Sequence, residues 1–443
     1  MNEVSVPFPD TPARRVVVTG LGVTSPIGLT IEQFHVSLTS GRSGISAVPD
    51  AGHAGPGFGG VISDFTGHIN DFGELPTSLR KQLRKSLKVM NRETQLAVAA
   101  TQGALRDSGL DQPSIDPERT GVSFGAGYVA IQPDDFLHGV EKCRTEDGDA
   151  DLDRWGEHGL GEVQPLWLLT CLPNMPGCYI AMYNDLQGPN NTITLGDGGA
   201  TLALAEAAHM IRGDLADVMV VGGCGNNLDS CSLMHVLLDE DLADAHEDPH
   251  HILKPFDRHR TGALPAEGAA AFVLEEYEAA MRRGATIYGE FLGSGSSAVV
   301  QGRTPRRGQA MANAGRAALQ AAEYTPADIG HVQAHGLSSR RVDAEEATAI
   351  RAILGNLADY VPVTSAKSYF GNASAGSDAM ELAAGLLALH HERLFPILNC
   401  REVDPDCPIN AVRNEPSDAG PSFLKLSVTP QGQAAAIVIR AAA

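Results

Sequence analysis

The stretch Gly188–Met210, GPNNTITLGDGGATLALAEAAHM, decides the fold of this 443-residue chain. Its first part, Asn191–Leu195, is rich in β-branched residues and predicts a buried strand. The turn GDGG at 196–199 follows, and Ala200–Ile211 has the alanine and leucine content of a helix. This elbow places Asp197 at the helix N-terminus, where unpaired N–H groups and the helix dipole favour negative charge.

An elbow between a strand and a helix is a common place for a catalytic nucleophile. Aspartate accepts acyl groups less readily than cysteine or serine. The position of Asp197 is therefore typical of a catalytic site, whereas the residue itself is not.

Composition excludes several classes of function. The chain has 33 basic and 54 acidic residues, a net charge of −21, which disfavours nucleic acid and anionic membranes as partners. Its seven cysteines form no CxxC pair and no zinc-binding spacing, as expected of thiols in a reducing cytoplasm. No apolar run reaches the length of a membrane span, and the first residues lack the apolar core of a signal peptide. We expect a cytoplasmic α/β protein without metal or cofactor.

Strand-like and helix-like segments alternate along both parts of the chain, which predicts two packed α/β layers related by duplication. We place the two halves at residues 14–275 and 276–443. A basic cluster at Arg80–Lys88 (Arg80, Lys81, Arg84, Lys85 and Lys88) has two interpretations: a solvated helix face, or a docking site for an acidic carrier.

Four further blocks match a known family in order along the chain. They are RRVVVTGLGVTSPIG (Arg14–Gly28), LKPFDRHRTGALPAEGAAAFVLEE (Leu253–Glu276), AHGLSSRRVD (Ala334–Asp343) and SAKSYFGN (Ser365–Asn372). With these blocks the chain resembles the β-ketoacyl-acyl-carrier-protein synthases from about Arg14 to Arg440. The resemblance implies the thiolase fold, with duplicated α-β-α-β-α layered halves.

Active members of that family use a cysteine at the elbow, two histidines and a lysine. In this sequence the cysteine position is Asp197, the first histidine is His335, the lysine is Lys367, and the second histidine is replaced by Asn372. The family's gating phenylalanine is also missing, because the corresponding segment reads TPQG at 429–432. Three separated departures indicate that the condensation site has been lost.

A ketosynthase-like chain without its cysteine resembles the chain-length factors, the partner subunits of type II polyketide ketosynthases. This resemblance implies a heterodimer with an active ketosynthase paralogue, and an acyl carrier protein that presents a phosphopantetheine-tethered chain. Asn191–Leu195 would form the dimer contact, and Thr170–Met182 would line the acyl tunnel. Many chain-length factors have glutamine at the Asp197 position and lack His335, so an aromatic and a polyene or highly reducing system both remain open.

Several roles stay open for the individual residues. Asp197 could be a structural helix cap, a partner of His335 that closes the pocket, or a general acid or base. We interpret His335 and Asn372 as hydrogen-bonding residues of a former site, because an amide does not titrate. The family pattern implies that Lys367 pairs with Glu346.

Two other classes of function compete with the chain-length role. The chain could be a stand-alone decarboxylase or ester-forming enzyme that uses Asp197 and His335. It could also be a degenerate ketosynthase that serves only as a scaffold.

Overall fold

A large mixed β-sheet organises the chain. The computed structural model describes residues 14–48, 57–110, 115–129, 131–244, 248–414 and 417–442. An 11-stranded sheet in these residues has the strand order β13-β12-β11-β14-β15-β8-β1-β7-β6-β4-β5. Two further two-stranded sheets pair β2 (Ile45–Ala47) with β3 (Phe58–Gly60) and β9 (Val300–Gln301) with β10 (Thr304–Pro305).

The strand order of the large sheet repeats. The N-terminal strands are β1 (Val16–Thr24), β4 (Thr120–Gly125), β5 (Asn190–Ile193), β6 (Val218–Asn226) and β7 (Glu267–Glu276). The C-terminal strands are β8 (Gly289–Ala298), β11 (His331–Gln333), β12 (Pro362–Thr364), β14 (Ser422–Val428) and β15 (Gln433–Arg440), with β13 (Asn410–Ala411) added outside β12. In each set the second, third and fourth strands run parallel, and the fifth is antiparallel to both of its neighbours. The predicted duplication is therefore confirmed.

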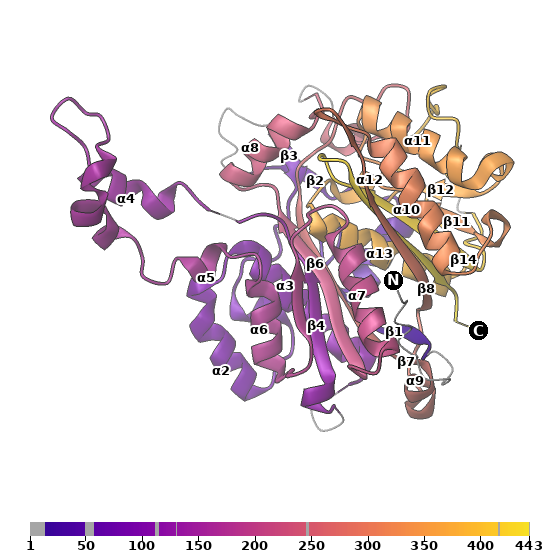
Figure 1. Cartoon of the computed structure of the whole chain (residues 1–443), viewed down its shortest axis with the longest axis horizontal. Helices are drawn as coiled ribbons and strands as arrows, with labels where there is room; N and C mark the ends of the chain where they lie inside the picture. Colours follow the sequence, from indigo (N-terminus) through magenta and orange to yellow (C-terminus); the bar gives the residue numbers. More distant parts are fainter. Residues whose placement is uncertain are drawn as a thin grey trace, which may run out of the picture.

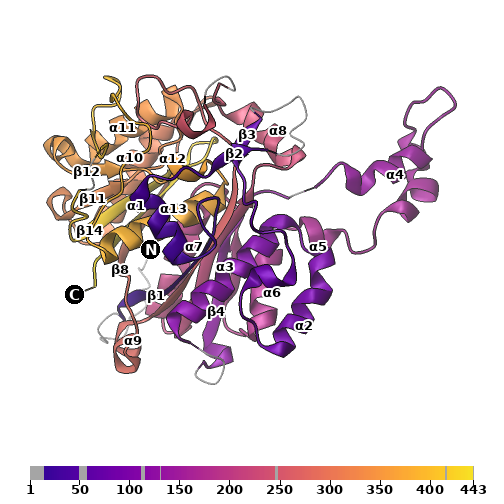
Figure 2. The same ribbon diagram turned by 180° about the vertical axis from the view of Figure 1, so that it is seen from behind.

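Two helices lie between the halves of the sheet, and several others cover its outer faces (Figures 1 and 2). The central pair is α7 (Gly199–Arg212) and α13 (Ala375–His390). Residues 375–389 of α13 are all buried, because a helix enclosed between the two halves of the sheet has no solvent-facing side. Its many alanines and leucines fit this position.

The outer helices pack on one half each. On the N-terminal half lie α2 (Thr77–Ser86), α3 (Arg92–Ser108) and α6 (Met175–Asn184), which Figure 2 shows grouped together. On the C-terminal half lie α10 (Arg307–Ala321) and α11 (Arg340–Leu354). The remaining helices are α1 (Ile31–Ser40), α4 (Asp134–Lys142), α5 (Leu168–Cys171), α8 (Ser230–Asp239), α9 (Tyr277–Arg283) and α12 (Lys367–Phe370).

One segment projects from the body of the molecule. It contains α4 and several short helical turns up to residue 162, and Figure 1 shows it extending away from the sheet. The sequence predicts a charged excursion at residues 134–163, and this prediction is confirmed. The segment also exposes apolar side chains, among them Leu137, Leu152 and Leu160.

One predicted strand needs correction, and one strand was missed. The strand expected at Asn191–Leu195 is β5, and its residues are exposed or half-buried because β4 is its only neighbour in the sheet formed by the described residues. Strand β14, SFLKLSV, was not expected at all, since Lys425 interrupts its apolar pattern. Its interior position depends on partners for Lys425 from other segments, described below.

Among the described residues, no helix is long and apolar enough to cross a membrane.

Candidate functional site

The elbow after β5 holds Asp197 between two glycines in the left-handed region. Gly196 has a φ of 68° and Gly198 a φ of 96°, conformations that side chains other than glycine rarely adopt. Gly198 is the N-cap of α7 and has no side chain to cap it, and the first-turn N–H of Thr201 donates to Asp378 instead of Asp197. The expectation that Asp197 caps α7 is therefore wrong, because the glycines turn the carboxyl group away from the helix N–H groups and into a cavity.

Asp197 is buried and incompletely hydrogen-bonded. The residue is 8% exposed, and its Oδ1 atom has no hydrogen-bond partner among the described residues. Burial raises the pKa of Asp197 to about 6, while Lys367 opposes the rise and the carboxylates of Glu381 and Asp378 add to it. The carboxyl group is thus mostly ionised above neutral pH, although the site stabilises that charge poorly.

A cluster of four buried charges lies next to the elbow. Lys367 on α12 pairs with Glu381 on α13, whose other oxygen lies 2.9 Å from the Nζ atom of Lys425 on β14. Lys425 also pairs with Asp378 at 2.5 Å, and Asp378 accepts a hydrogen bond from the backbone N–H of Thr201 at 2.7 Å. These interactions join α7, α12, α13 and β14.

The predicted pair between Lys367 and Glu346 is absent. Both carboxylate oxygens of Glu346 accept backbone N–H groups instead, from His335 at 2.7 Å and from Gly336 at 2.8 Å. Lys367 forms its ion pair with Glu381 instead, because this buried carboxylate on α13 lies beside it. Glu346 thus fixes the backbone of the turn that carries His335.

His335 is a neutral, enclosed imidazole. The residue is 2% exposed, and the Nζ atom of Lys367 lies 3.3 Å from its Nδ1 atom. Burial and the charges of Lys367 and Lys425 hold the pKa of His335 well below its usual range. Among the described residues, no hydrogen bond or ion pair joins His335 to Asp197.

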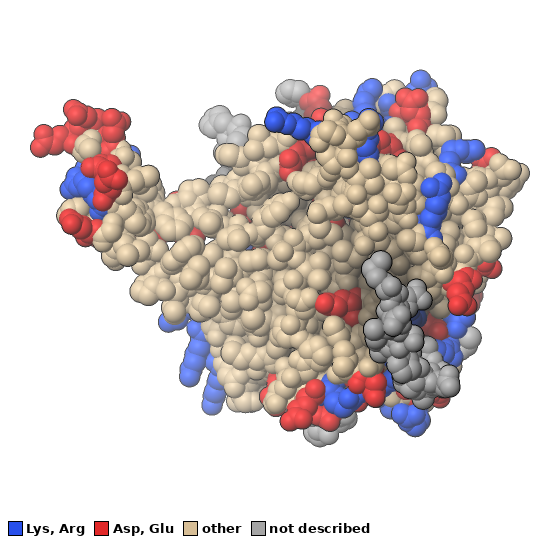
Figure 3. Space-filling model, viewed as in Figure 1, with Lys and Arg blue, Asp and Glu red and all other residues tan. Residues whose placement is uncertain are grey.

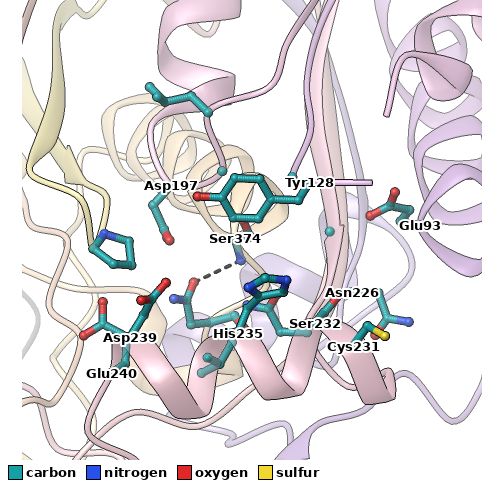
Figure 4. Close-up of a pocket in the computed structure, with 18 of the residues that line it drawn as sticks. Glu93, Tyr128, Asp197, Asn226, Cys231, Ser232, His235, Asp239, Glu240 and Ser374 are labelled. Carbon is teal, nitrogen blue, oxygen red and sulfur yellow. Dashed lines mark hydrogen bonds between the residues drawn. The ribbon is translucent and has the colours of Figure 1, made fainter. Parts of the chain in front are cut away.

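Asn372 lines the cavity and also the small space behind it that Lys367 lines. Its Oδ1 atom accepts the backbone N–H of Ser374 at 3.1 Å, the bond drawn in Figure 4. Its backbone is bonded on both sides, with N–H donating to Leu264 and C=O accepting from Ala266. The structure thus brings Asp197 and Asn372 to one cavity, while His335 and Lys367 lie behind it.

The cavity has a volume of about 80 Å³, room for on the order of five water molecules. The loop at 429–432 forms part of its wall through Pro430 and Gln431. Arg307 donates to the backbone oxygen of Pro430 at 3.3 Å, and Gln431 donates to Asp239 on α8 at 3.1 Å. The loop where the resemblance places a gate is therefore tied to neighbouring elements.

A buried ion pair supports the same wall. Arg307 is 2% exposed and holds Glu240 at 3.0 Å. Burial raises the pKa of Glu240 to about 7, Arg307 opposes this rise, and Asp197 adds to it. The charges of Asp197 and Glu240 therefore repel each other across the cavity.

Sequence reasoning missed most of this supporting structure. Asp378 and Glu381 stand in an otherwise apolar helix and Lys425 in an apolar strand, which is the one signal that could have identified them as buried partners. Arg307 and Glu240 give no comparable signal, because charged residues at helix ends are usually solvated. Among the described residues, no group of three or more His, Cys, Asp or Glu is arranged to hold a metal ion.

Comparison with known proteins defines the class to which this architecture belongs. The model of "Beta-ketoacyl synthase, N-terminal domain" matches residues 13–280, and that of "Beta-ketoacyl synthase, C-terminal domain" matches residues 288–401. The chain therefore belongs to the β-ketoacyl synthase family and has the thiolase fold.

Two named relatives come from polyketide systems. The chain is 33% identical to the tetracenomycin polyketide synthase ketoacyl synthase alpha subunit of Streptomyces glaucescens, over 90% of this chain and 91% of the relative. It is 32% identical to the granaticin polyketide putative beta-ketoacyl synthase 1 of Streptomyces violaceoruber, with the same coverage.

Solved structures show the same similarity. The AntDE:AntF complex, a type II PKS acyl-carrier protein with its ketosynthase bound to the hexaketide, gives a TM-score of 0.81 at 28% identity, covering 97% of this chain and 100% of that chain. The ishigamide ketosynthase/chain length factor gives 0.80 at 25% identity, covering 98% and 100%.

The raised pKa of Asp197 predicts a pH-dependent stability difference for Asp197→Asn. The pKa rises from 3.8 to about 6 on folding, so ionisation costs nothing below about pH 4 and its full amount above about pH 7. At pH 8 the free energy of unfolding of Asp197→Asn should exceed that of the wild type by about 2–3 kcal/mol, and at pH 4 the two should converge. Denaturant unfolding at several pH values measures this. The exposed Asp406→Asn is the control, and a difference that does not change with pH would contradict the prediction.

Removal of the shared carboxylate should destabilise the fold. Glu381→Gln leaves Lys367 and Lys425 with one carboxylate between them, and breaking a buried ion pair in this way costs about 3–5 kcal/mol. The exposed Glu141→Gln on α4 should change the free energy of unfolding by less than about 0.5 kcal/mol. Equal effects of the two substitutions in denaturant unfolding would show that the cluster does not stabilise the fold.

Proposed function

We propose that this chain is the non-condensing subunit of a type II polyketide ketosynthase heterodimer, in which it shapes the acyl tunnel and limits chain length. The observation that carries this proposal is Asp197 at the elbow, where the resemblance places the nucleophilic cysteine. A carboxylate attacks a thioester poorly and would give a mixed anhydride that hydrolyses readily. The site therefore lacks the covalent acyl step of condensation.

The surroundings of the elbow support a lost condensation site. Decarboxylative condensation needs imidazole groups beside the thioester, to stabilise the charge that develops at the malonyl carbonyl. His335 is enclosed behind the cavity, and the amide of Asn372 stands where the resemblance expects the second imidazole. Arg307 and Gln431 restrain the loop at 429–432, so Pro430 cannot open the site as a mobile phenylalanine would.

The surface around β5 supports a partner subunit. One edge of this strand pairs with β4, and no strand among the described residues pairs with the other edge. Helix α6 packs beside β5 and exposes Cys178 and Met182. Figure 3 shows a broad face without charged side chains between the body and the projecting segment, and such a face is typical of an interface.

The partners of the relatives support the identity of the carrier. One related structure is a ketosynthase with its acyl-carrier protein, and another is a ketosynthase with a chain length factor. On this chain α2 buries Leu79 and Leu83 and turns its basic residues outward, where they suit an acidic carrier protein. We assign carrier docking to this helix and acyl-chain contacts to α6.

One observation favours a second candidate function. A carboxyl group with a pKa of about 6 can give and take a proton near neutral pH, as a general acid or base must. The chain would then be a decarboxylase or ester-forming enzyme in its own right. Turnover of acyl or malonyl thioesters by the isolated chain, lost in Asp197→Asn, would favour this function over the chain-length role.

Co-expression with an intact ketosynthase paralogue tests the chain-length role. The two chains should purify as a heterodimer, and Cys178→Phe should shorten the polyketide product without abolishing its formation, because added volume fills tunnel space. Met281→Phe on α9, also an exposed apolar site, is the matched control and should leave product length unchanged. Mass spectrometry of the products reads out both. Unchanged product length with Cys178→Phe would remove the tunnel role from α6.

Restoration of the thiol should not restore condensation. Asp197→Cys would have the helix N-terminus to lower the pKa of its thiol and should react with iodoacetamide. Loss of one charge-stabilising donor costs on the order of 10²–10³ in rate, and Asn372 supplies no imidazole. The variant should therefore stay at least about 100-fold below an active ketosynthase in a condensation assay with its carrier protein. Near-normal turnover would show that Asp197 is the only lesion.

A further inference from the structure

The cavity beside Asp197 has an unusual charge. Four carboxylic side chains contribute to its lining, from Glu93, Asp197, Asp239 and Glu240. No lysine or arginine is among the described residues that line it. Figure 4 shows Asp197, Asp239 and Glu240 gathered on one side of the cavity.

Nearby cations do not compensate for this charge. Arg307 reaches the wall from behind and is occupied by both oxygens of Glu240. Lys367 and Lys425 are matched by Glu381 and Asp378, so the buried cluster behind the cavity is neutral as a whole. None of these three cations is therefore paired with the negative charge of Asp197.

Asp197 offers an acceptor to a ligand. Its side chain is more than nine-tenths buried and lines the cavity, and its Oδ1 atom, which is closed to solvent, has no hydrogen-bond partner among the described residues. The amide of Asn372 is the hydrogen-bond donor that lowers the pKa of this carboxyl group. A buried carboxylate with so few donors is costly, and a donor that enters the cavity would reduce that cost. This under-bonded carboxylate is the observation that points to a bound group.

An aromatic wall suits a cationic group. The rings of Tyr128 and His235 lie with centroids 5.7 Å apart on the wall of the cavity, and Figure 4 shows Tyr128 beside Asp197. Burial and the negative charges of Asp239 and Asp197 raise the pKa of Tyr128, so its phenol stays neutral. The face of a neutral phenol attracts an ammonium group at short range.

We propose that this cavity binds the protonated amine of a small ligand, with the carboxylate of Asp197 as its acceptor and the ring of Tyr128 beside it. The volume of about 80 Å³ has room for a small group such as aminomethyl. The same carboxylates repel an acid such as the malonyl group. The cavity thus selects by charge, independently of any chain-length role.

Stable amides of N-acetylethylenediamine test this selection, because they differ only at the acyl end. The glycyl amide ends in NH₃⁺, the propionyl amide ends in CH₃ at the same number of heavy atoms, and the malonyl amide ends in a carboxylate. Isothermal titration of the full-length chain at pH 7, where the α-amino group is mostly protonated and Asp197 mostly ionised, should give a Kd for the glycyl amide at least about tenfold below that of the propionyl amide, since a charged hydrogen bond of this kind is worth a factor of ten or more. The malonyl amide should bind weakest.

Two variants test whether Asp197 causes the preference for the glycyl amide. Asp197→Asn keeps the shape of the side chain and removes its charge, so the preference for the glycyl over the propionyl amide should fall to about threefold or less. The exposed Asp406→Asn makes the same chemical change outside the cavity and should keep the full preference. A melting curve of each variant establishes that it is folded.

Several results would overturn the proposal. These are malonyl binding at least as tight as glycyl binding, equal binding of the glycyl and propionyl amides, or no binding of any amide at millimolar concentration. A preference that survives in folded Asp197→Asn would also overturn it. None of these results bears on the heterodimer, which co-purification tests separately.

Discussion

The ion pairs among Lys367, Glu381, Lys425 and Asp378 hold the centre of this molecule together. They connect the two central helices to a strand of the C-terminal half, and Asp378 also receives a backbone N–H of α7. Charges buried this deeply are tolerated only when each has its partner, so the spacing of α7, α12, α13 and β14 is strongly constrained. The glycine elbow directly precedes α7, so these ion pairs also constrain the position of Asp197.

The electrostatics of the elbow follow from that arrangement. Because two lysines and two carboxylates already balance, the charge of Asp197 is an addition to a neutral interior. Burial is therefore the largest influence on its pKa, and Lys367 and the amide of Asn372 oppose it only in part. A site that could stabilise a thiolate or an enolate would need spare positive charge near the elbow. Here the nearby cations are committed: Lys367 to Glu381, and Arg307 to Glu240.

Local sequence patterns predicted the alternating elements, the duplication and the elbow, because glycine turns and apolar periodicity act within a few residues. They failed where partners come from distant segments. Lys425 made β14 unrecognisable as a strand, since its counter-ions lie more than 40 residues away. Lys367 was assigned to Glu346 by family pattern, whereas both oxygens of Glu346 are used by backbone N–H groups. The side-chain environment of Asp197 depends on all of these and could not be read from the elbow alone.

The open edge of β5 has a consequence for the cell that makes this protein. In the proposed heterodimer, a chain produced in excess of its partner would present unpaired backbone N–H and C=O groups next to the exposed Met182 of α6, and such edges recruit other strands. Orphan copies would aggregate or be degraded. In the proposed heterodimer, the ratio of the two chains therefore affects how much of each stays soluble. Synthesis of both chains in equal amounts, at the same time and place, would protect both.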